Sequence, residues 1–421
     1  MAIASPINSA FTGISNTVGQ PLLTTVANPL PTGIHLPTGR TQAGLDAALG
    51  QGIAGRIPSQ AYGYSQQWNL AVKRALGTRN TIMVAYAGAK GTHLVLSSGF
   101  TGTGLNLNQL PDNYHSLGSA LLNQVSNPFC GVLPAGTTFG AATIAQGYLL
   151  SPHPQYQGVS QVVSRYGYSS YNAFQAMYDL HVSHNGLPQV AYTWSKLLSN
   201  TDNTSSFQDG QGGYGVVQDN NNLGPEYSLS LQDLPQNLVI NYGLDLPFGH
   251  GQTYLSKVNG FTNALVGGWR VNGITIFRSG IPIALQAAGN GLSQFGTGPI
   301  RPNYTSGCGR NLSGDPHSAS RAAEWFNTSC FTQPDVFAFG NENRVDSVMR
   351  SEAGQNFDFS INKSFDVTEK VKLKFSTEIF DLFDHAQFAI PNSNLSSPGF
   401  GRVGQQSNLP RTIQFALRLT F

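Results

Sequence analysis

The chain has 421 residues, of which 10% are charged and 10% aromatic, and its formal net charge is +2. Ordinary globular proteins carry roughly 25% charged residues, while disordered chains are poor in aromatic residues, so this composition indicates a folded chain of unusual polarity. The small net charge gives no electrostatic case for a nucleic-acid partner. The sequence has no window of about 18 uninterrupted apolar residues, which excludes a membrane-spanning helix.

Residues 1–61 are rich in Gly, Pro, Thr and Ala and show no sustained periodicity. We interpret this segment as loop, with at most a short helix near Gly44–Leu49. It lacks the basic region and the apolar stretch of a secretory signal. Because an exported protein requires such a signal, we expect either that the protein is not exported or that its front is missing.

From residue 62 onward, apolar and polar residues alternate over nine separate stretches, which is the pattern of β-strands. The last stretch is the clearest, because Ile413, Phe415, Leu417, Leu419 and Phe421 fall on one face and polar residues or Ala416 on the other. A strand of roughly 9–11 residues also matches the span of a bilayer. The expected strands are 62–75, 81–96, 164–183, 189–198, one ending at Leu246, 267–285, 356–365, 370–383 and 411–421.

The connections between these strands alternate in length along the chain. The short ones are about 77–80, 184–188, 247–266 and 366–369, and the long ones are about 97–163, 199–225, 286–354 and 386–409. Outer-membrane barrels alternate in this way between periplasmic turns and extracellular loops, whereas a soluble β-sandwich has no reason to do so.

The sequence therefore predicts an all-β fold, an antiparallel transmembrane β-barrel with long extracellular loops. We expect a partial barrel of about nine to twelve strands, with 1–61 as a truncated extracellular loop and 62–421 as the C-terminal part of the barrel. Bacterial single-chain barrels have even strand numbers, and a hidden hairpin in 97–163 would leave an odd count odd. An odd count thus favours a piece of a larger barrel.

An ordered series of motifs resembles the barrel of Oar-like TonB-dependent receptors, the group often preceded by a carboxypeptidase-regulatory-like domain. The resemblance covers about residues 60–421. Its motifs are Gln66–Leu70 (QQWNL), Val84–His93 (VAYAGAKGTH), Tyr171–Gln175 (YNAFQ), Ala191–Lys196 (AYTWSK), Leu246–Gly249 (LPFG), Gly268–Trp269, Arg278–Gly280 (RSG), Glu378–His385 (EIFDLFDH) and the closing Phe421.

This resemblance implies an outer-membrane transporter with a 22-stranded barrel and an N-terminal plug, energised through a periplasmic TonB contact. It implies outer-membrane lipid and the barrel-assembly machinery as partners, with Phe421 as the assembly signal. The sequence lacks the signal peptide, the TonB box, the plug and the early strands of the family. Contact with the TonB complex would thus require the missing N-terminal part.

The three cysteines are Cys130, Cys308 and Cys330. Cys308 and Cys330 lie in one Gly/Asn/Ser-rich segment, where a disulfide would fit an extracytoplasmic loop and contribute on the order of 3 kcal/mol. The alternative is two free thiols. Cys130 has no nearby base that would make it a nucleophile.

Several patterns that could carry chemistry fail on spacing. Gly210–Gly215 satisfies G-x-G-x-x-G but opens no helix, which favours a loop over a dinucleotide site. Ser360 and Lys363 form S-x-x-K, yet residues three apart on a strand point to opposite faces, and the same argument separates His181 from His184. We predict no catalytic arrangement, no cofactor and no enzyme activity.

Two further groups have a structural or a binding interpretation. Asp202, Asp209, Asp219 and 220–222 could offer oxygen ligands to Ca²⁺, but they miss the EF-hand spacing, so a solvated loop is favoured. The aromatic residues Trp68, Trp194 and Trp269 would form interfacial girdles in a barrel, and ordinary core packing is the alternative.

The expected function is uptake of an unidentified large or scarce solute through a polar lumen in the outer membrane. One alternative is a secreted or surface β-rich adhesin or carbohydrate-binding protein. A second is an enzyme acting on surface polymers, which the lack of a coherent acid/base set disfavours.

Overall fold

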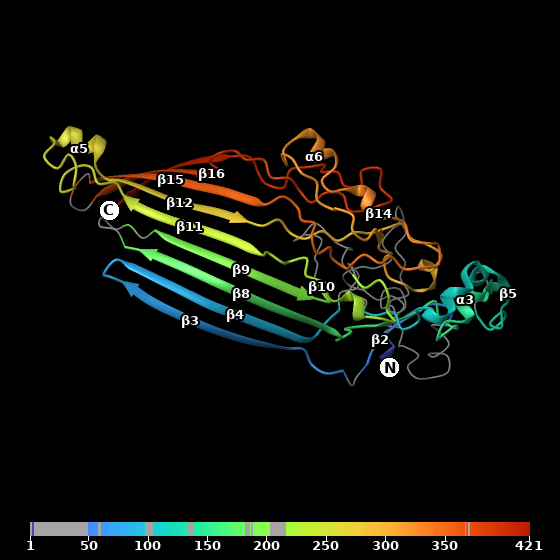
Figure 1. Ribbon diagram of the computed structural model, residues 1–421. Coiled ribbons are helices and arrows are strands. Elements are labelled where there is room, and N and C mark those ends of the chain that lie inside the picture. The colour runs from blue at the N-terminus through green and yellow to red at the C-terminus, as the bar shows by residue number, and fades with distance from the viewer. Residues whose placement is uncertain are drawn as a thin grey trace, which may run out of the picture.

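The computed structural model shows one long curved sheet and, at one end of it, a body of mostly irregular chain (Figure 1). We call this second part the loop body; it is built by residues 49–57, 104–161 and the long connections between strands. The structure describes residues 2–3, 49–57, 60–96, 104–133, 138–181, 186, 188–202, 216–366, 368 and 371–421.

The large sheet holds nine long strands whose spatial order follows the chain, so each strand pairs with its predecessor. Every pairing along this path is antiparallel. The short β10 (Ser228–Leu229) adds to the end of β9. The strands are β3 (Tyr64–Leu76), β4 (Asn80–Leu94), β8 (Gly167–Leu180), β9 (Gln189–Ser199), β11 (Gln236–Asp245), β12 (Trp269–Arg278), β15 (Gly354–Asp366), β16 (Lys372–Phe380) and β17 (Thr412–Thr420). The predicted antiparallel sheet is confirmed, and each expected strand corresponds to one of these.

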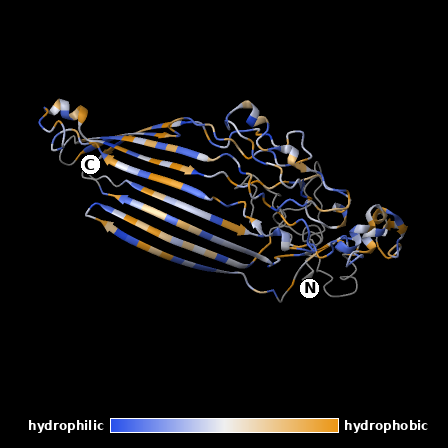
Figure 2. Ribbon diagram, viewed as in Figure 1, coloured by the Kyte–Doolittle hydropathy of each residue, from blue (hydrophilic) through white to orange (hydrophobic). Residues whose placement is uncertain are grey.

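One face of this sheet is mainly apolar, although Lys90, Lys196 and Lys363 also lie on it, and we call it the apolar face. The hydropathy alternates along the strands in Figure 2, and the register aligns residues of one kind across neighbours. Across β3, β4, β8 and β9, for example, Leu70, Tyr86, Phe174 and Trp194 form one row. Leu70 is 71% exposed and Trp194 61%. A soluble β-sandwich would bury this row against a second sheet, whereas here the row is exposed.

The opposite face carries mainly polar and small side chains, and we call it the polar face. One row across it consists of Gln414, Glu378, Ser360, Asn272 and Gly243. On β4 the two faces differ sharply in exposure. The exposed fractions are 39% for Val84, 42% for Tyr86 and 3% for Ala85 between them.

The connections alternate between the two ends of the sheet as the sequence predicts. The short ones lie at the end near the C-terminus in Figure 1 and the long ones at the end occupied by the loop body. The connection from β11 to β12 carries the helix α5 (Gly260–Val266), whose N-cap Asn259 accepts a hydrogen bond from the Thr262 backbone N–H. Short turns at one end and long connections at the other are thus confirmed.

The loop body contains short helices and strands that the sequence does not predict. A hairpin does occur within 97–163, but β5 and β6 form their own two-stranded sheet and add nothing to the large one. The elements are β5 (Gln124–Ser126), β6 (Thr143–Ala145), β7 (Gly158–Gln161), β13 (Asn303–Tyr304), β14 (Phe331–Thr332), α3 (Gln146–Leu149), α6 (Ala319–Ala323), η1 (Asp112–Leu122), η2 (Thr138–Gly140), η3 (Gly224–Glu226), η4 (Ser293–Phe295) and η5 (Thr328–Cys330).

The expectation of loop throughout residues 1–61 needs correction. The strand β2 (Gly52–Arg56) pairs with β1 (Ala2–Ile3) and, in parallel, with β7. A five-residue segment with two glycines is too short to show periodicity, and its strand conformation depends on a partner about 100 residues downstream. The helix expected near Gly44–Leu49 falls outside the described residues except for Leu49.

The hydrophobic cores lie in the loop body rather than against the sheet. The largest cluster joins Ile283 and Leu285 with residues from about 325 to 349 and receives Phe388 and Phe400 from the last connection. A second cluster joins Leu110, Leu121, Leu292 and Phe295. These clusters hold distant connections together, so the long loops fold as one packed body at the end of the sheet.

If the apolar face contacts lipid, a charge there is costly. Leu417→Arg on β17 should lower the free energy of unfolding in lipid vesicles by about 2–4 kcal/mol, because a guanidinium near the bilayer midplane loses its hydration. The control is Ala416→Arg on the polar face of the same strand, which should change it by less than about 1 kcal/mol. Urea titration in vesicles measures both, and equal effects would contradict the assignment of the faces.

Candidate functional site

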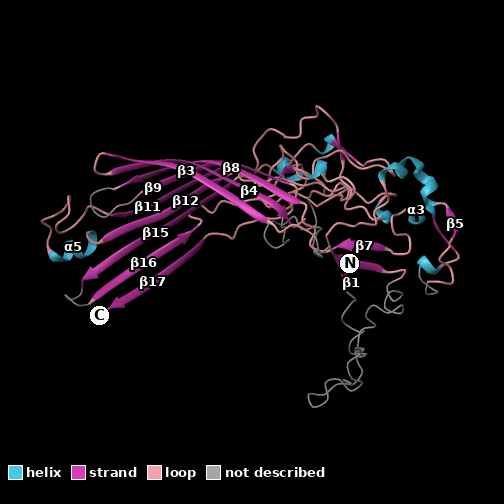
Figure 3. Cartoon of the chain, turned by 90° about the horizontal axis from the view of Figure 1, so that it is seen from below, coloured by secondary structure: helices cyan, strands magenta, loops and turns pink. Residues whose placement is uncertain are grey.

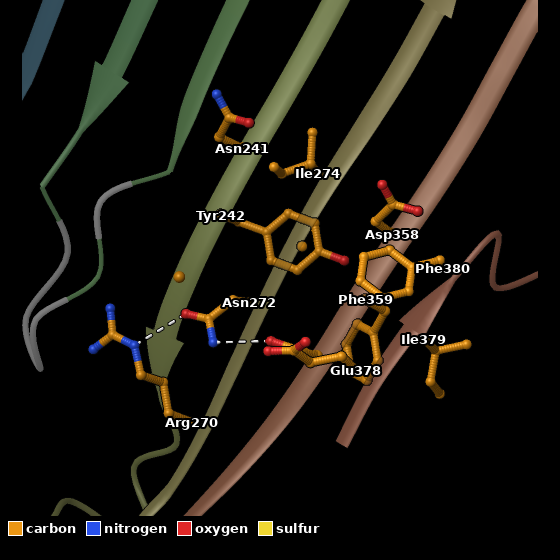
Figure 4. Close-up of a pocket in the computed structure, with 13 residues that line it drawn as sticks. Asn241, Tyr242, Arg270, Asn272, Ile274, Asp358, Phe359, Glu378, Ile379 and Phe380 are labelled. Carbon is orange, nitrogen blue, oxygen red and sulfur yellow. Dashed lines mark hydrogen bonds between the residues drawn. The ribbon is translucent and has the colours of Figure 1, made fainter. Parts of the chain in front are cut away.

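A groove lies on the polar face between β11, β12, β15 and β16, with a cavity volume of about 520 Å³ (Figure 4). Its polar lining comes from Asn241, Arg270, Asn272, Ser360 and two carboxylates. The apolar lining includes Ile274 of β12 and Phe380 of β16. Concave sites of this kind, with a few placed polar groups, are the usual form of small-molecule sites.

A chain of hydrogen bonds runs across the groove floor. The Arg270 guanidinium donates to Asp245 at 2.9 Å and, through Nε, to Asn272 Oδ1 at 3.0 Å. Asn272 Nδ2 donates in turn to Ser360 Oγ at 3.2 Å. Gly243 leaves room for this arrangement, because a Cβ there would lie 2.9 Å from Asn272 Oδ1 and 3.0 Å from Arg270 Nη2. The floor is therefore held in one arrangement, with the charge of Arg270 matched by Asp245.

Two carboxylates face the groove on neighbouring strands. Asp358 accepts hydrogen bonds from Asn356 Nδ2 at 2.8 Å and from the Asp381 backbone N–H at 3.1 Å. The Glu378 carboxylate makes no hydrogen bond or ion pair with any described residue. The groove thus offers an arginine that is paired with Asp245 and a carboxylate, Glu378, that has no partner, and such groups can orient a polar solute. Group-transfer chemistry needs a nucleophile hydrogen-bonded to a base, and the described lining residues form no such pair.

At the end of the sheet, buried arginines tie the long connections together. Arg344 is fully buried and donates to the Asp202 carboxylate and to the backbone oxygens of Ser199 at 2.7 Å and Glu226 at 2.9 Å. Asp202 follows β9, and Arg344 lies in the connection between β12 and β15. One side chain thereby fixes the exit of β9 against a loop about 140 residues away.

A second set of ion pairs continues this network. Arg301 pairs with the carboxylate of Glu226 and donates to the Glu342 backbone oxygen at 3.2 Å. Arg310 lies 3.4 Å from Glu342 and 3.0 Å from Asp346. Breaking a buried pair by removing one partner typically costs about 3–5 kcal/mol, so these contacts specify one arrangement of the loop body.

Burial shifts the titration of this network. Desolvation and the neighbouring Asp346 carboxylate raise the pKa of Glu342 to about 7, against the opposing effects of Arg310 and Arg301. Desolvation also lowers the pKa of Arg301 and raises that of Asp219, whose hydrogen bonds from the Asn221 backbone and from Gln109 act in the other direction. The Glu342 carboxylate, whose ordinary pKa is 4.5, therefore titrates near neutral pH.

The cysteines and tryptophans singled out in the sequence have the following places. Cys308 and Cys330 form a disulfide with a Cα–Cα distance of 5.6 Å, while Cys130 is free and exposed. Trp68 and Trp194 lie exposed on the apolar face. Trp269, at the short-turn end of β12, donates through Nε1 to the Leu265 oxygen at 2.8 Å. Their role as interfacial girdles stays a prediction, as does the assembly signal at Phe421.

The structure also places the remaining sequence patterns, and it corrects the expectation of a solvated loop at Asp202 and Asp219, which are both buried. The register separates Ser360, which accepts from Asn272, from Lys363, which lies over the Trp269 ring on the opposite face. Of the oxygen cluster considered for Ca²⁺, Asp202 is engaged by Arg344, and no group of three or more His, Cys, Asp or Glu side chains within the described ranges is placed to hold a metal. Asp209, His184 and 210–215 lie outside the described residues.

Comparison with known proteins identifies the family. The model of a family described as outer membrane β-barrel domain matches residues 2–414. The chain belongs to that family. The protein accordingly resides in the cell outer membrane of Gram-negative type, and its apolar face is the one suited to lipid. No helix among the described residues is long and apolar enough to span a membrane.

Solved structures with similar folds include two outer-membrane proteins. The outer membrane transporter YddB from Escherichia coli is 8% identical, with 88% of this chain and 34% of that chain covered at a TM-score of 0.41. The ferripyoverdine receptor of the outer membrane of Pseudomonas aeruginosa is 10% identical, with 85% and 27% covered at a TM-score of 0.33. The chain thus spans about a third or less of their length. A search of curated proteins gave no match.

The disulfide should stabilise the loop body by about 3 kcal/mol, because it closes a loop of 22 residues in the unfolded chain. Replacing Cys308 and Cys330 together by Ser should therefore increase proteolysis of the connection 279–353 in intact outer membranes. Cys130→Ser is the matched control and should leave the cleavage rate unchanged. Equal protection of the double variant and the parent would refute this contribution.

The raised pKa of Glu342 predicts a pH dependence. The folded state holds this proton more tightly than the unfolded state, so stability is highest below about pH 4.5 and decreases as pH rises to about 7. The loss is on the order of 3 kcal/mol. Glu342→Gln should remove this pH dependence of stability. Asp335→Asn, at an exposed carboxylate of the same connection, should leave it unchanged. Stability at each pH is measured by thermal unfolding, followed by the fluorescence of Trp325 in a protein that keeps it as the sole tryptophan. Identical pH profiles for the parent and Glu342→Gln would contradict the role of Glu342.

Proposed function

We propose that the chain is the C-terminal barrel portion of a TonB-dependent outer-membrane transporter that takes up a large or scarce solute. The observation that carries this proposal is the two-faced sheet, mainly apolar on one side and mainly polar on the other along its nine long strands. A membrane protein needs this alternation only where lipid lies on one side and water on the other. The Oar-like motifs of the sequence support the TonB-dependent subtype.

The groove and the loop body suggest how uptake would proceed. Solute first meets the loop body, whose buried ion pairs and disulfide keep the long connections in place. It then passes along the polar face, where the groove offers hydrogen-bonding groups held by the Arg270–Asn272–Ser360 chain. Energy for uptake would enter through a plug and a TonB contact supplied by polypeptide outside residues 1–421. The chain contributes binding and passage rather than catalysis.

Uptake is tested by comparing solute depletion from the medium, measured by mass spectrometry, for wild-type cells, cells that lack this gene and cells that lack TonB. We expect at least one solute to be depleted by wild-type cells alone. A change in cell attachment with unchanged solute depletion would instead favour a surface adhesin. Depletion that persists without TonB would remove the TonB-dependent subtype and leave a passive channel.

A substitution in the groove sharpens this test. Asn272→Trp places an indole in the cavity and interrupts the hydrogen-bond chain, so uptake of the depleted solute should fall by about tenfold or more, as a barrier of about 1.4 kcal/mol produces. The control is Val271→Trp, one residue away on the apolar face, with equal abundance in the outer membrane checked by immunoblot. Unchanged uptake by Asn272→Trp would show that the solute does not use the groove.

A further inference from the structure

The connection from β11 to β12, residues 246–268, exposes large apolar side chains at the short-turn end of the sheet. Its helix α5 lies beyond the ends of the strands, opposite the loop body, in both views (Figure 1, Figure 3). Phe261 and Leu265 of this helix are 78% and 59% exposed, and Tyr254 and Leu255 before it are also exposed. The connection contains no Asp or Glu. Exposed apolar groups gathered in this way mark a surface that binds a partner or a membrane.

The polar side of α5 is held by the connection itself. The Asn263 side-chain oxygen accepts a hydrogen bond from the His250 backbone N–H at 2.7 Å. Successive residues of an α-helix are rotated by about 100°, so Phe261 and Leu265, two positions before and after Asn263, lie on the opposite side. The helix therefore has one side that packs on its own connection and one apolar side that is open.

Two side chains from the apolar face of the sheet reach the end of this connection. Trp269 donates through Nε1 to the Leu265 oxygen at 2.8 Å. Lys363, which lies opposite Trp269 in the register, donates through Nζ to the Gly267 oxygen. The Lys363 side chain is buried, with its Nζ 5.2 Å from the centre of the Trp269 ring. The end of the connection is thus fastened to the side of the sheet that is suited to lipid, so Leu265 adjoins the apolar face.

We propose that residues 246–268 form an interfacial anchor, which inserts Phe261 and Leu265 into the phospholipid leaflet at the short-turn end of the sheet. The occupant is lipid because the open side of α5 continues a face suited to lipid, and because the connection has no carboxylate that would require hydration. Helices with one apolar side lie in the plane of a membrane and bury that side below the headgroups. Trp269 and Lys363 then lie at the boundary, where aromatic rings and long basic side chains are common. This role goes beyond the proposed solute uptake and does not depend on it.

The anchor is tested with nitroxide labels on the complete gene product, purified from outer membranes and reconstituted in vesicles of phosphatidylethanolamine and phosphatidylglycerol. Phe261→Cys and Gly260→Cys, each combined with Cys130→Ser, carry the label. Gly260 is the matched control, because it lies toward the Asn263 side of the helix and a Cβ there meets no atom within 4 Å. The ratio of collisions with oxygen to collisions with a polar nickel chelate should be about fivefold or more higher at Phe261→Cys, because oxygen concentrates in the apolar layer and the chelate stays in water.

Both other outcomes of this measurement contradict the anchor. Equal ratios at the two sites, with the chelate reaching each label, would show that the connection is a solvated loop. A label at Phe261→Cys that is shielded from both oxygen and the chelate would show that a protein, rather than lipid, covers α5.

A charge on the open side of α5 gives a second measurement. Leu265→Asp should lower the ratio at Phe261→Cys to that of Gly260→Cys, because a carboxylate is costly to remove from water and draws the helix out of the lipid. Leu265→Met, which keeps the side chain apolar, should retain the high ratio. Heat-modifiable gel migration verifies that each variant is folded. A ratio that is insensitive to Leu265→Asp would rule out insertion of this side of the helix.

Discussion

The requirement that every backbone N–H and C=O be paired determines the form of this molecule. Within lipid, the sheet ladder is the means by which strands meet this requirement, and the period-two alternation of side chains then separates an apolar from a polar face. The rows Leu70–Tyr86–Phe174–Trp194 and Gln414–Glu378–Ser360–Asn272 show both consequences on one sheet. The sheet needs no second layer, because lipid takes the place of a hydrophobic core.

This explains why the hydrophobic clusters gather in the loop body. Outside the membrane the long connections lack a sheet to cover them, so they pack on one another through residues such as Leu285, Phe326 and Phe295. Arg344 and Arg301 then satisfy carboxylates and backbone oxygens that this packing buries. A buried ion pair adds little stability compared with apolar packing but penalises other arrangements. The network thus selects one arrangement of the loops at the end of the sheet.

The strands could be predicted from the sequence because each encodes its own periodicity over about ten residues. The alternation of short and long connections followed from the same pattern. The parts that sequence reasoning missed depend on partners distant in the chain: β2 is a strand because β7 lies beside it, and Arg344 is buried because Asp202 follows β9. The groove was also missed. Its signal, Arg270 next to the Gly268–Trp269 motif and Asn272 two residues on, gains meaning only through the register with β11 and β15.

The polar face combines side chains that are held by hydrogen bonds with side chains that remain available to a solute. Arg270 is matched by Asp245 and linked through Asn272 to Ser360, so the floor of the groove keeps its shape without a bound solute. Glu378, one strand further, is left to bind water or solute. Side chains that are already hydrogen-bonded to each other lose little conformational entropy when a solute binds, whereas a group without a partner can form a new hydrogen bond to the solute. The division between Arg270 and Glu378 therefore leaves an ordered surface that still offers an acceptor, which is what the proposed passage of a polar solute requires.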